Sequence, residues 1–183
     1  MIVLGALMGL LLLGTSEPVA PQAPAPVPSY TVTLTGYNAV PEQTDGDPFT
    51  TASGAYSNPE VVAARSVDLA SQLPFGTIIE ITGPANDPKN SCGYHVVDDV
   101  IGYRVIADAM NPRYTKRIDV LFDTKANYLM ADATTKNAGT VLGICDGVTI
   151  RVIGRIKIGQ IPKTQAELAK LVAAVKNTVA VNK

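Results

Sequence analysis

The segment "VIADAMNPRYTKRIDVLFD", residues 105–123, contains two short apolar runs that each carry one aspartate. These aspartates are Asp108 and Asp119, and the turn-forming residues 111–114 lie between them. A carboxylate at the edge of a half-buried strand is costly unless it has a partner or a chemical role. The segment therefore predicts two strands joined by a short loop, with an acidic side chain at the edge of each.

The body of the chain around this segment has the pattern of a β-rich domain. Alternating apolar and Thr residues predict a strand over 30–38, and a turn at Pro74 and Gly76 leads into another strand. The remaining expectations are a strand and a short helix over 60–72, one or two strands over 94–108, a short helix over 124–139 that ends at Gly139, and a last strand or strand pair over 148–159. Roughly six or seven short strands with Gly- and Pro-containing turns favour a compact, mainly β barrel with minor helices.

The long polar segment over 41–59 and the end of the chain differ from this pattern. The segment is rich in Pro, Gly, Asp and Thr, and loops of this kind often carry function. After Pro162 the apolar residues recur at helical spacing, at Leu168, Leu171, Val172 and Val175. Thr164 is a suitable N-cap, and Glu167 three residues later completes a capping box. We therefore expect residues 161–183 to form a C-terminal helix or tail.

The first 29 residues are not expected to belong to the folded domain. Residues 1–16 contain an apolar run that is shorter than the roughly 20 residues of a membrane-spanning helix, and small residues follow it. This pattern favours a signal peptide, with an uncleaved N-terminal anchor as the alternative. The Pro- and Ala-rich residues 17–29 predict an extended linker. The chain is therefore expected to be exported to the cell envelope or beyond, with membrane contact only through an anchor.

Composition argues against nucleic-acid binding and a zinc site, and it allows one disulfide. The formal net charge of −1 gives no electrostatic basis for nucleic-acid binding. The two cysteines, Cys92 and Cys145, form either one disulfide, as in many exported proteins, or two unpaired buried thiols. Because His95 is the only histidine, the sequence does not predict a zinc site, and we expect neither a metal nor another cofactor.

Several segments between residues 31 and 154 resemble the 3D domain, a family named for three aspartates. The resemblance rests on "TGYN", "PEQTDGDPFTTASG", "LPFGT" and above all "VIADAMNPRYTKRIDVLF". It implies a six-stranded double-psi β-barrel over residues 30–160, with short helices and a C-terminal helix. This barrel is akin to that of membrane-bound lytic transglycosylase A, and more distantly to rare-lipoprotein-A-like and expansin barrels.

The resemblance also implies roles for the aspartates. Asp119 falls on the catalytic acid of the family and Asp108 on its acidic partner in the substrate groove. The third family aspartate precedes the "LPFGT" turn, where Asp68 is the nearest acidic residue, although an ungapped match places Leu69 there. The alternative for Asp108 and Asp119 is a structural role, in which they bind loop amides or pair with arginines.

The implied activity is that of an exported lytic transglycosylase acting on peptidoglycan or another cell-wall polysaccharide. One carboxyl group protonates the glycosidic oxygen and then accepts the proton of the C6 hydroxyl, which closes a 1,6-anhydro sugar. Such a group must hold a proton near neutral pH, and burial or a second carboxylate raises an aspartate pKa in that direction. The residues expected to bind the substrate are Tyr37, Thr51, Asn111, Arg113 and Tyr114. The alternatives are a non-catalytic, expansin-like wall-binding module and a purely structural envelope protein.

Overall fold

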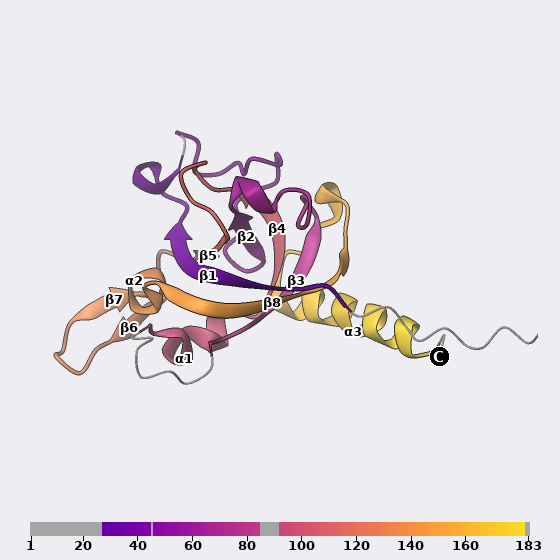
Figure 1. Ribbon diagram of the computed structural model, residues 1–183. Helices are drawn as coiled ribbons and strands as arrows, with labels where there is room; N and C mark the ends of the chain where they lie inside the picture. The colour runs from indigo at the N-terminus through magenta and orange to yellow at the C-terminus, as the bar shows by residue number, and fades with distance from the viewer. Residues whose placement is uncertain (1–26, 45, 85–91, 182–183) are drawn as a thin grey trace, which may run out of the picture.

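The computed structural model describes residues 27–44, 46–84 and 92–181 (Figure 1). The expected signal peptide or anchor over 1–16, and most of the expected linker over 17–29, lie outside the described residues. Within the described ranges, no helix combines the length and the apolar composition that a membrane span requires.

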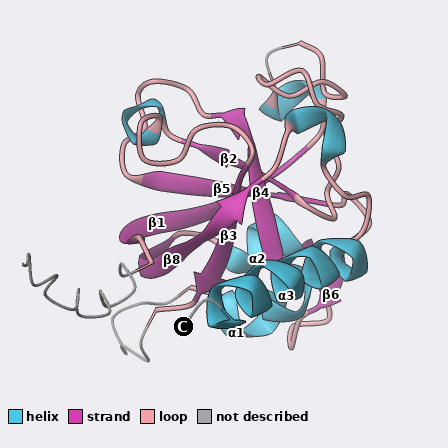
Figure 2. Ribbon diagram, turned by 90° about the vertical axis from the view of Figure 1, so that its right-hand side faces the viewer, coloured by secondary structure: helices cyan, strands magenta, loops and turns pink. Residues whose placement is uncertain are grey.

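Six strands close into one barrel, in the order β1-β5-β2-β4-β3-β8 (Figure 2). The barrel strands are β1 (Ser29–Asn38), β2 (Val62–Arg65), β3 (Thr77–Thr82), β4 (Tyr103–Ala109), β5 (Arg117–Phe122) and β8 (Cys145–Arg155). A separate hairpin consists of β6 (Asn127–Leu129) and β7 (Thr135–Asn137). The helices are α1 (Tyr94–Val97), α2 (Ala138–Leu142) and α3 (Gln165–Val181), with 3-10 turns η1 (Pro41–Gln43), η2 (Val67–Leu69), η3 (Asp98–Val100) and η4 (Ile158–Gln160). This mainly β barrel with short helices and a C-terminal helix confirms the expected fold class.

The barrel mixes parallel and antiparallel pairs. β1 pairs with β5, and β2 with β4, in parallel, whereas the other neighbours in the barrel are antiparallel. The two strands of the acidic segment, β4 and β5, are therefore not paired with each other, because β2 lies between them. The loop after β1 and the loop between β4 and β5 lie at one end of the barrel, and α1, α2 and the β6–β7 hairpin lie at the other (Figure 1).

The turn before β3 has the geometry that the sequence predicts. Gly76 has a φ of +87°, which residues with a side chain rarely adopt. The Ile156 carbonyl also fills the space that a Cβ at this position would need. The Gly76 N–H donates to the Ile106 carbonyl over 2.8 Å, and the Ile156 N–H donates to the Gly76 carbonyl over 2.8 Å. This glycine therefore joins β3 to the strands beside it at close range.

Buried Arg104 in β4 holds the end of the 41–59 loop against the barrel. Its guanidinium donates to the carbonyls of Pro59, Ile101 and Leu121, among others. Burial lowers the pKa of Arg104 to about 10, so the group remains charged at neutral pH. This role could not be predicted from the sequence, because an arginine within a strand is more often exposed.

Residues 94–108 were expected to form one or two strands, and for the first half this is wrong. Residues 94–97 form α1, and the strand β4 begins only after Gly102, whose φ is +56°. Tyr94 and Val97 are three residues apart, so a helical turn places both on one face, where both are buried. The packing of this face against the core therefore favours a helical turn over an extended strand.

Residues 124–139 were expected to form a helix ending at Gly139, and this prediction is also wrong. They form the β6–β7 hairpin, whose turn is closed by Asp132, a carboxylate that accepts from the N–H and the hydroxyl of Thr134. The helix α2 begins where the expected one ended, because Asn137 caps it by accepting from the Gly139 N–H over 3.1 Å. Local hydrogen bonds in turns and caps decide the secondary structure of this region, because its elements are too short to show a helical or strand periodicity.

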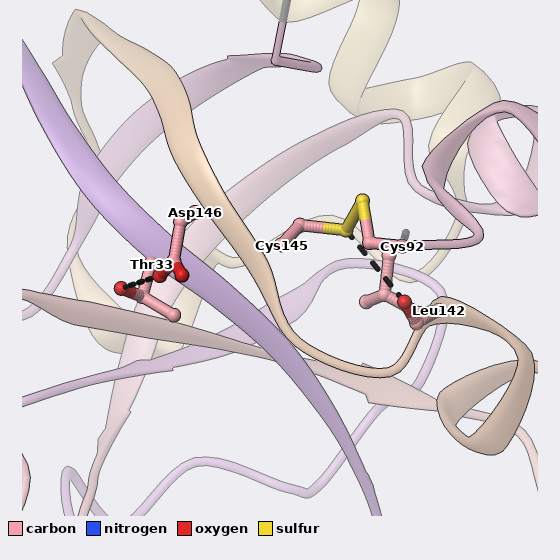
Figure 3. Close-up of a disulfide and its surroundings, with 5 residues drawn as sticks. All are labelled: Thr33, Cys92, Leu142, Cys145 and Asp146. Carbon is pink, nitrogen blue, oxygen red and sulfur yellow. Dashed lines mark hydrogen bonds between the residues drawn. A yellow bond between two sulfur atoms is a disulfide. The ribbon is translucent and has the colours of Figure 1, made fainter. Parts of the chain in front are cut away.

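A disulfide joins Cys92, just before α1, to Cys145, the first residue of β8 (Figure 3). This confirms the disulfide alternative of the sequence analysis. The two residues are 53 apart in the sequence, so the link stabilises the fold by roughly 4 kcal/mol in the chain-entropy description. Disulfides persist in oxidising compartments, so the bond is typical of an exported protein.

Helix α3 begins with the capping box that the sequence predicts. The Glu167 N–H donates to the Thr164 hydroxyl over 3.2 Å, and the Thr164 N–H donates to the Glu167 carboxylate over 3.2 Å. One turn later, Leu168 and Val172 are fully buried against the barrel. The cap therefore fixes the start of the helix at the point where its apolar face meets the core.

Thr164→Ala should lower the free energy of unfolding by about 1 kcal/mol, because an alanine side chain cannot accept the hydrogen bond from the Glu167 N–H. Urea unfolding followed by circular dichroism measures this change. Thr178→Ala is the matched control, since Thr178 is exposed in the same helix and its hydroxyl donates to the Ala174 carbonyl, one turn back in that helix. Equal effects of the two substitutions would contradict the capping role.

Candidate functional site

Ala64 in β2 lies between the two aspartates. It pairs with Asp119 of β5 on one side and with Asp108 of β4 on the other. Two strand spacings therefore separate the aspartates along the sheet, which places their Cα atoms roughly 9–10 Å apart. The methyl group of Ala64 leaves the space between the two carboxyl groups open.

A β-bulge turns Asp108 toward Asp119. The parallel register runs from Ala63 and Ile106 to Ala64 and Asp108, so Ala107 is an extra residue in β4. Side chains alternate between the faces of a strand, and one extra residue reverses this alternation beyond it. Asp108 therefore faces the same side as Ala64, whereas a regular strand would point it to the opposite face.

Tyr37 of β1 forms a hydrogen bond with Asp108 of β4. Its hydroxyl donates to Asp108 Oδ2 over 2.8 Å, although β5 and β2 lie between their strands. Three strand spacings amount to roughly 14 Å along a flat sheet, so this bond depends on the curvature of the closed sheet. Burial, followed by the charge of Asp108, raises the pKa of Tyr37 well above its ordinary value, so the hydroxyl keeps its proton and remains a donor.

Asp108 also accepts two backbone hydrogen bonds. Its Oδ1 accepts from the N–H of Ala52 over 2.8 Å and from the N–H of Ala109 over 2.9 Å. With the bond from Tyr37, the carboxylate accepts three hydrogen bonds, and none of them requires a proton on Asp108. The group thus also has the structural role that the sequence left open, because it fixes the 41–59 loop to the end of β4.

Asp119 has a different environment. The residue is half-buried, but its Oδ1 is fully buried and has no hydrogen-bond partner among the described residues. Burial raises the pKa of Asp119 from 3.8 to about 6, against the opposing effects of a Thr35 hydrogen bond and the Arg117 charge, and Asp108 adds a smaller increase. Both effects that the sequence analysis named act in the expected direction, and burial is the larger.

The two aspartates line one open cavity of about 580 Å³. One wall is the loop after β1, which contributes Glu42, Gln43, Thr44, Asp47, Thr50, Thr51, Ala52 and Ser57. The other wall is the loop after β4, which contributes Ala109, Met110, Asn111, Arg113 and Tyr114. The floor consists of Gly36, Tyr37, Ala64, Asp108 and Asp119. The cavity is therefore an acidic floor between two polar loops.

All seven residues expected in the site line this cavity, although their contacts differ. The hydroxyl of Thr51 bonds within its own turn, with Ser53 and Ala55. The side chain of Asn111 accepts from the Arg113 N–H over 3.1 Å and so shapes the second loop. That these side chains bind a substrate stays a prediction.

Asp68, the nearest match to a third family aspartate, lies outside the cavity. It is exposed, and its carboxylate accepts from the N–H of Lys116 over 3.0 and 3.2 Å. Lys116 has a φ of +49°, a conformation that non-glycine residues seldom adopt. A hydrogen bond from Ser66 is the main cause that lowers the pKa of Asp68. Asp68 therefore braces the loop between β4 and β5.

Glu42, Gln43 and Thr50 also line the cavity, although no motif in the sequence marks them. The polar composition of residues 41–59 did indicate a functional loop, and that loop forms one wall of the cavity. The sequence could not predict which side chains of this loop line the cavity. Their positions depend on the turn at Thr51 and on a single β-bridge between Thr50 and Tyr56.

Tyr37→Phe should lower the free energy of unfolding by about 1–2 kcal/mol, because it removes a hydrogen bond to a carboxylate and keeps the ring. Urea unfolding measures the loss. Tyr56→Phe deletes the same hydroxyl from a side chain that is 68% exposed and should have almost no effect. A Tyr37→Phe protein as stable as the wild type would show that the bond to Asp108 contributes nothing.

A scan against models of known protein families finds none that matches this chain. A search of curated proteins finds no significant match. The closed barrel is compatible with the 3D domain but does not establish it, so that resemblance stays a prediction.

Proposed function

We propose that this protein is an exported enzyme of the cell envelope that cleaves peptidoglycan as a lytic transglycosylase. The observation that carries the proposal is Asp119, a carboxyl group with a pKa raised to about 6 on the floor of a cavity that it shares with Asp108. A pKa in this range lets one group donate and accept a proton near neutral pH. The disulfide and the apolar start of the chain support export.

Asp119 acts first as an acid and then as a base. Its proton passes to the glycosidic oxygen as the bond from that oxygen to C1 of the muramic acid breaks, and an oxocarbenium-like centre develops at C1. The Asp119 carboxylate then accepts the proton of the C6 hydroxyl, and the C6 oxygen bonds to C1. The products are a 1,6-anhydro end and a free hydroxyl on the leaving sugar, and Asp119 is again protonated.

Asp108 supplies the fixed negative charge of the site. Three hydrogen bonds hold its carboxylate on the floor, from Tyr37, Ala52 and Ala109. A preorganised anion near C1 stabilises the positive charge that develops there. The division of roles between the aspartates follows from their environments: Asp119 is poor in hydrogen bonds and can hold a proton, whereas Asp108 is surrounded by donors.

Incubation of the purified chain with murein sacculi tests the proposal. Mass spectrometry should detect muropeptides with 1,6-anhydro ends, which are lighter by one water than hydrolysed products. Binding to sacculi without such products would instead favour a non-catalytic wall-binding module. Neither binding nor cleavage would favour a structural protein of the envelope.

A further inference from the structure

We infer that Arg113, Tyr114 and Arg117 form a carboxylate-binding subsite at the edge of the cavity, which recognises the acidic stem peptide of the glycan. This inference rests on the proposed function and names the part of the substrate that the second loop binds. Arg113 and Tyr114 line the cavity beside Asp108 and Asp119. Arg117 begins β5, two residues before Asp119 and on the same face of the strand.

One tyrosine ring orders both guanidinium groups. The Cζ atoms of Arg113 and Arg117 each lie 4.7 Å from the centroid of the Tyr114 ring. Arg113 Nη2 also donates to the Tyr114 hydroxyl over 2.8 Å. Stacking of this kind removes much of the freedom of two long side chains before a ligand arrives, so less entropy is lost on binding.

Neither of the two guanidinium groups forms an ion pair with a carboxylate in the part of the chain that the structure describes. Among the described residues, the buried Nε of Arg117 also has no hydrogen-bond partner. Arginine forks match carboxylates in a planar, bidentate geometry. A carboxylate of the ligand is therefore the natural partner of this pair.

The loop that carries Arg113 and leads into Arg117 is held in place from two sides. Asn111 accepts from the Arg113 N–H at its start, and Asp68 accepts from the Lys116 N–H at its end. The cavity is thus polarised, with acidic side chains on its floor and two guanidiniums at one edge. A glycan with a carboxylate beside the scissile sugar fits this polarity, whereas an uncharged glycan leaves the basic edge unpaired.

Calorimetric titration of the full chain separates these cases. The first probe is the N-acetylglucosaminyl–N-acetylmuramyl disaccharide with its stem peptide, which contains no bond that a lytic transglycosylase cleaves. The second is the same compound with its carboxylates converted to amides. The acidic probe should bind about tenfold more tightly, because a hydrogen bond to a charged group contributes roughly 1.5 kcal/mol or more.

Arg113→Gln should remove this preference by weakening the acidic probe about tenfold and leaving the amidated probe unchanged. Arg113 is exposed, so the variant should fold, and Arg155→Gln, an exposed arginine of β8, should change neither affinity. Equal binding of both probes, equal weakening of both by Arg113→Gln, or no binding of either would overturn the subsite. The sacculus digestion tests the proposed function separately. If the protein forms anhydro ends but does not prefer the acidic probe over the amidated one, only the subsite is overturned.

Discussion

Asp119→Asn should lower the rate of anhydro-sugar formation by about 10²–10⁴-fold, the usual contribution of a positioned general acid–base group. The asparagine has nearly the same shape, so it should still fit between Thr35 and Ala64, the neighbours of Asp119 in β1 and β2. It cannot donate a proton to the glycosidic oxygen or accept one from the C6 hydroxyl. Quantification of anhydro-muropeptides released from sacculi over time measures the loss.

Asp98→Asn is the matched control for this substitution. Asp98 is exposed in η3, outside the cavity, so the same chemical change there should leave the rate unaltered. Binding of the variant to sacculi should persist, since Asp119 is only one of the groups that line the cavity. Turnover by Asp119→Asn at the wild-type rate would remove Asp119 from the mechanism and return it to a structural role.

The sequence predicted the barrel class because its strands are short and separated by strong turn signals. Residues 30–38 and the Pro74–Gly76 turn illustrate this, since their alternation and turn chemistry act locally. The errors fell on residues 94–97 and 124–137, where the elements are only three or four residues long. In such short segments, core contacts and a single capping residue decide between helix and strand.

The sequence also predicted which residues gather at the cavity, although it could not predict how they meet. A bulge at Ala107 cannot be read from an apolar run, and without it Asp108 would point away from Asp119. The bond from Tyr37 to Asp108 depends on closure of the barrel, which no local pattern records. Fold class is set by local propensities, whereas the site depends on register and closure.

The wild-type protein should lose about 3 kcal/mol of stability as the pH rises from about 3 to about 7, through Asp119 alone. Burial raises its folded-state pKa to about 6, above the ordinary value of 3.8. The folded state therefore binds the proton more tightly than the unfolded state does. The stabilisation is complete below the unfolded-state pKa and is lost as the pH passes through the folded-state pKa. The site is thus least stable in the ionised form that must accept the C6 proton.

Comparison with Asp119→Asn isolates this contribution from other groups. Asp47, Asp68 and Asp132 have lowered pKa values and act in the opposite direction, but they are present in both proteins. The variant should match the wild type near pH 3 and exceed its free energy of unfolding by up to about 3 kcal/mol at pH 7, because the asparagine amide stays uncharged at both pH values. Urea unfolding at several pH values measures the difference. A variant that is less stable than the wild type at pH 7 would show that ionised Asp119 is stabilised by partners in the fold, and its raised pKa could then not support acid–base catalysis.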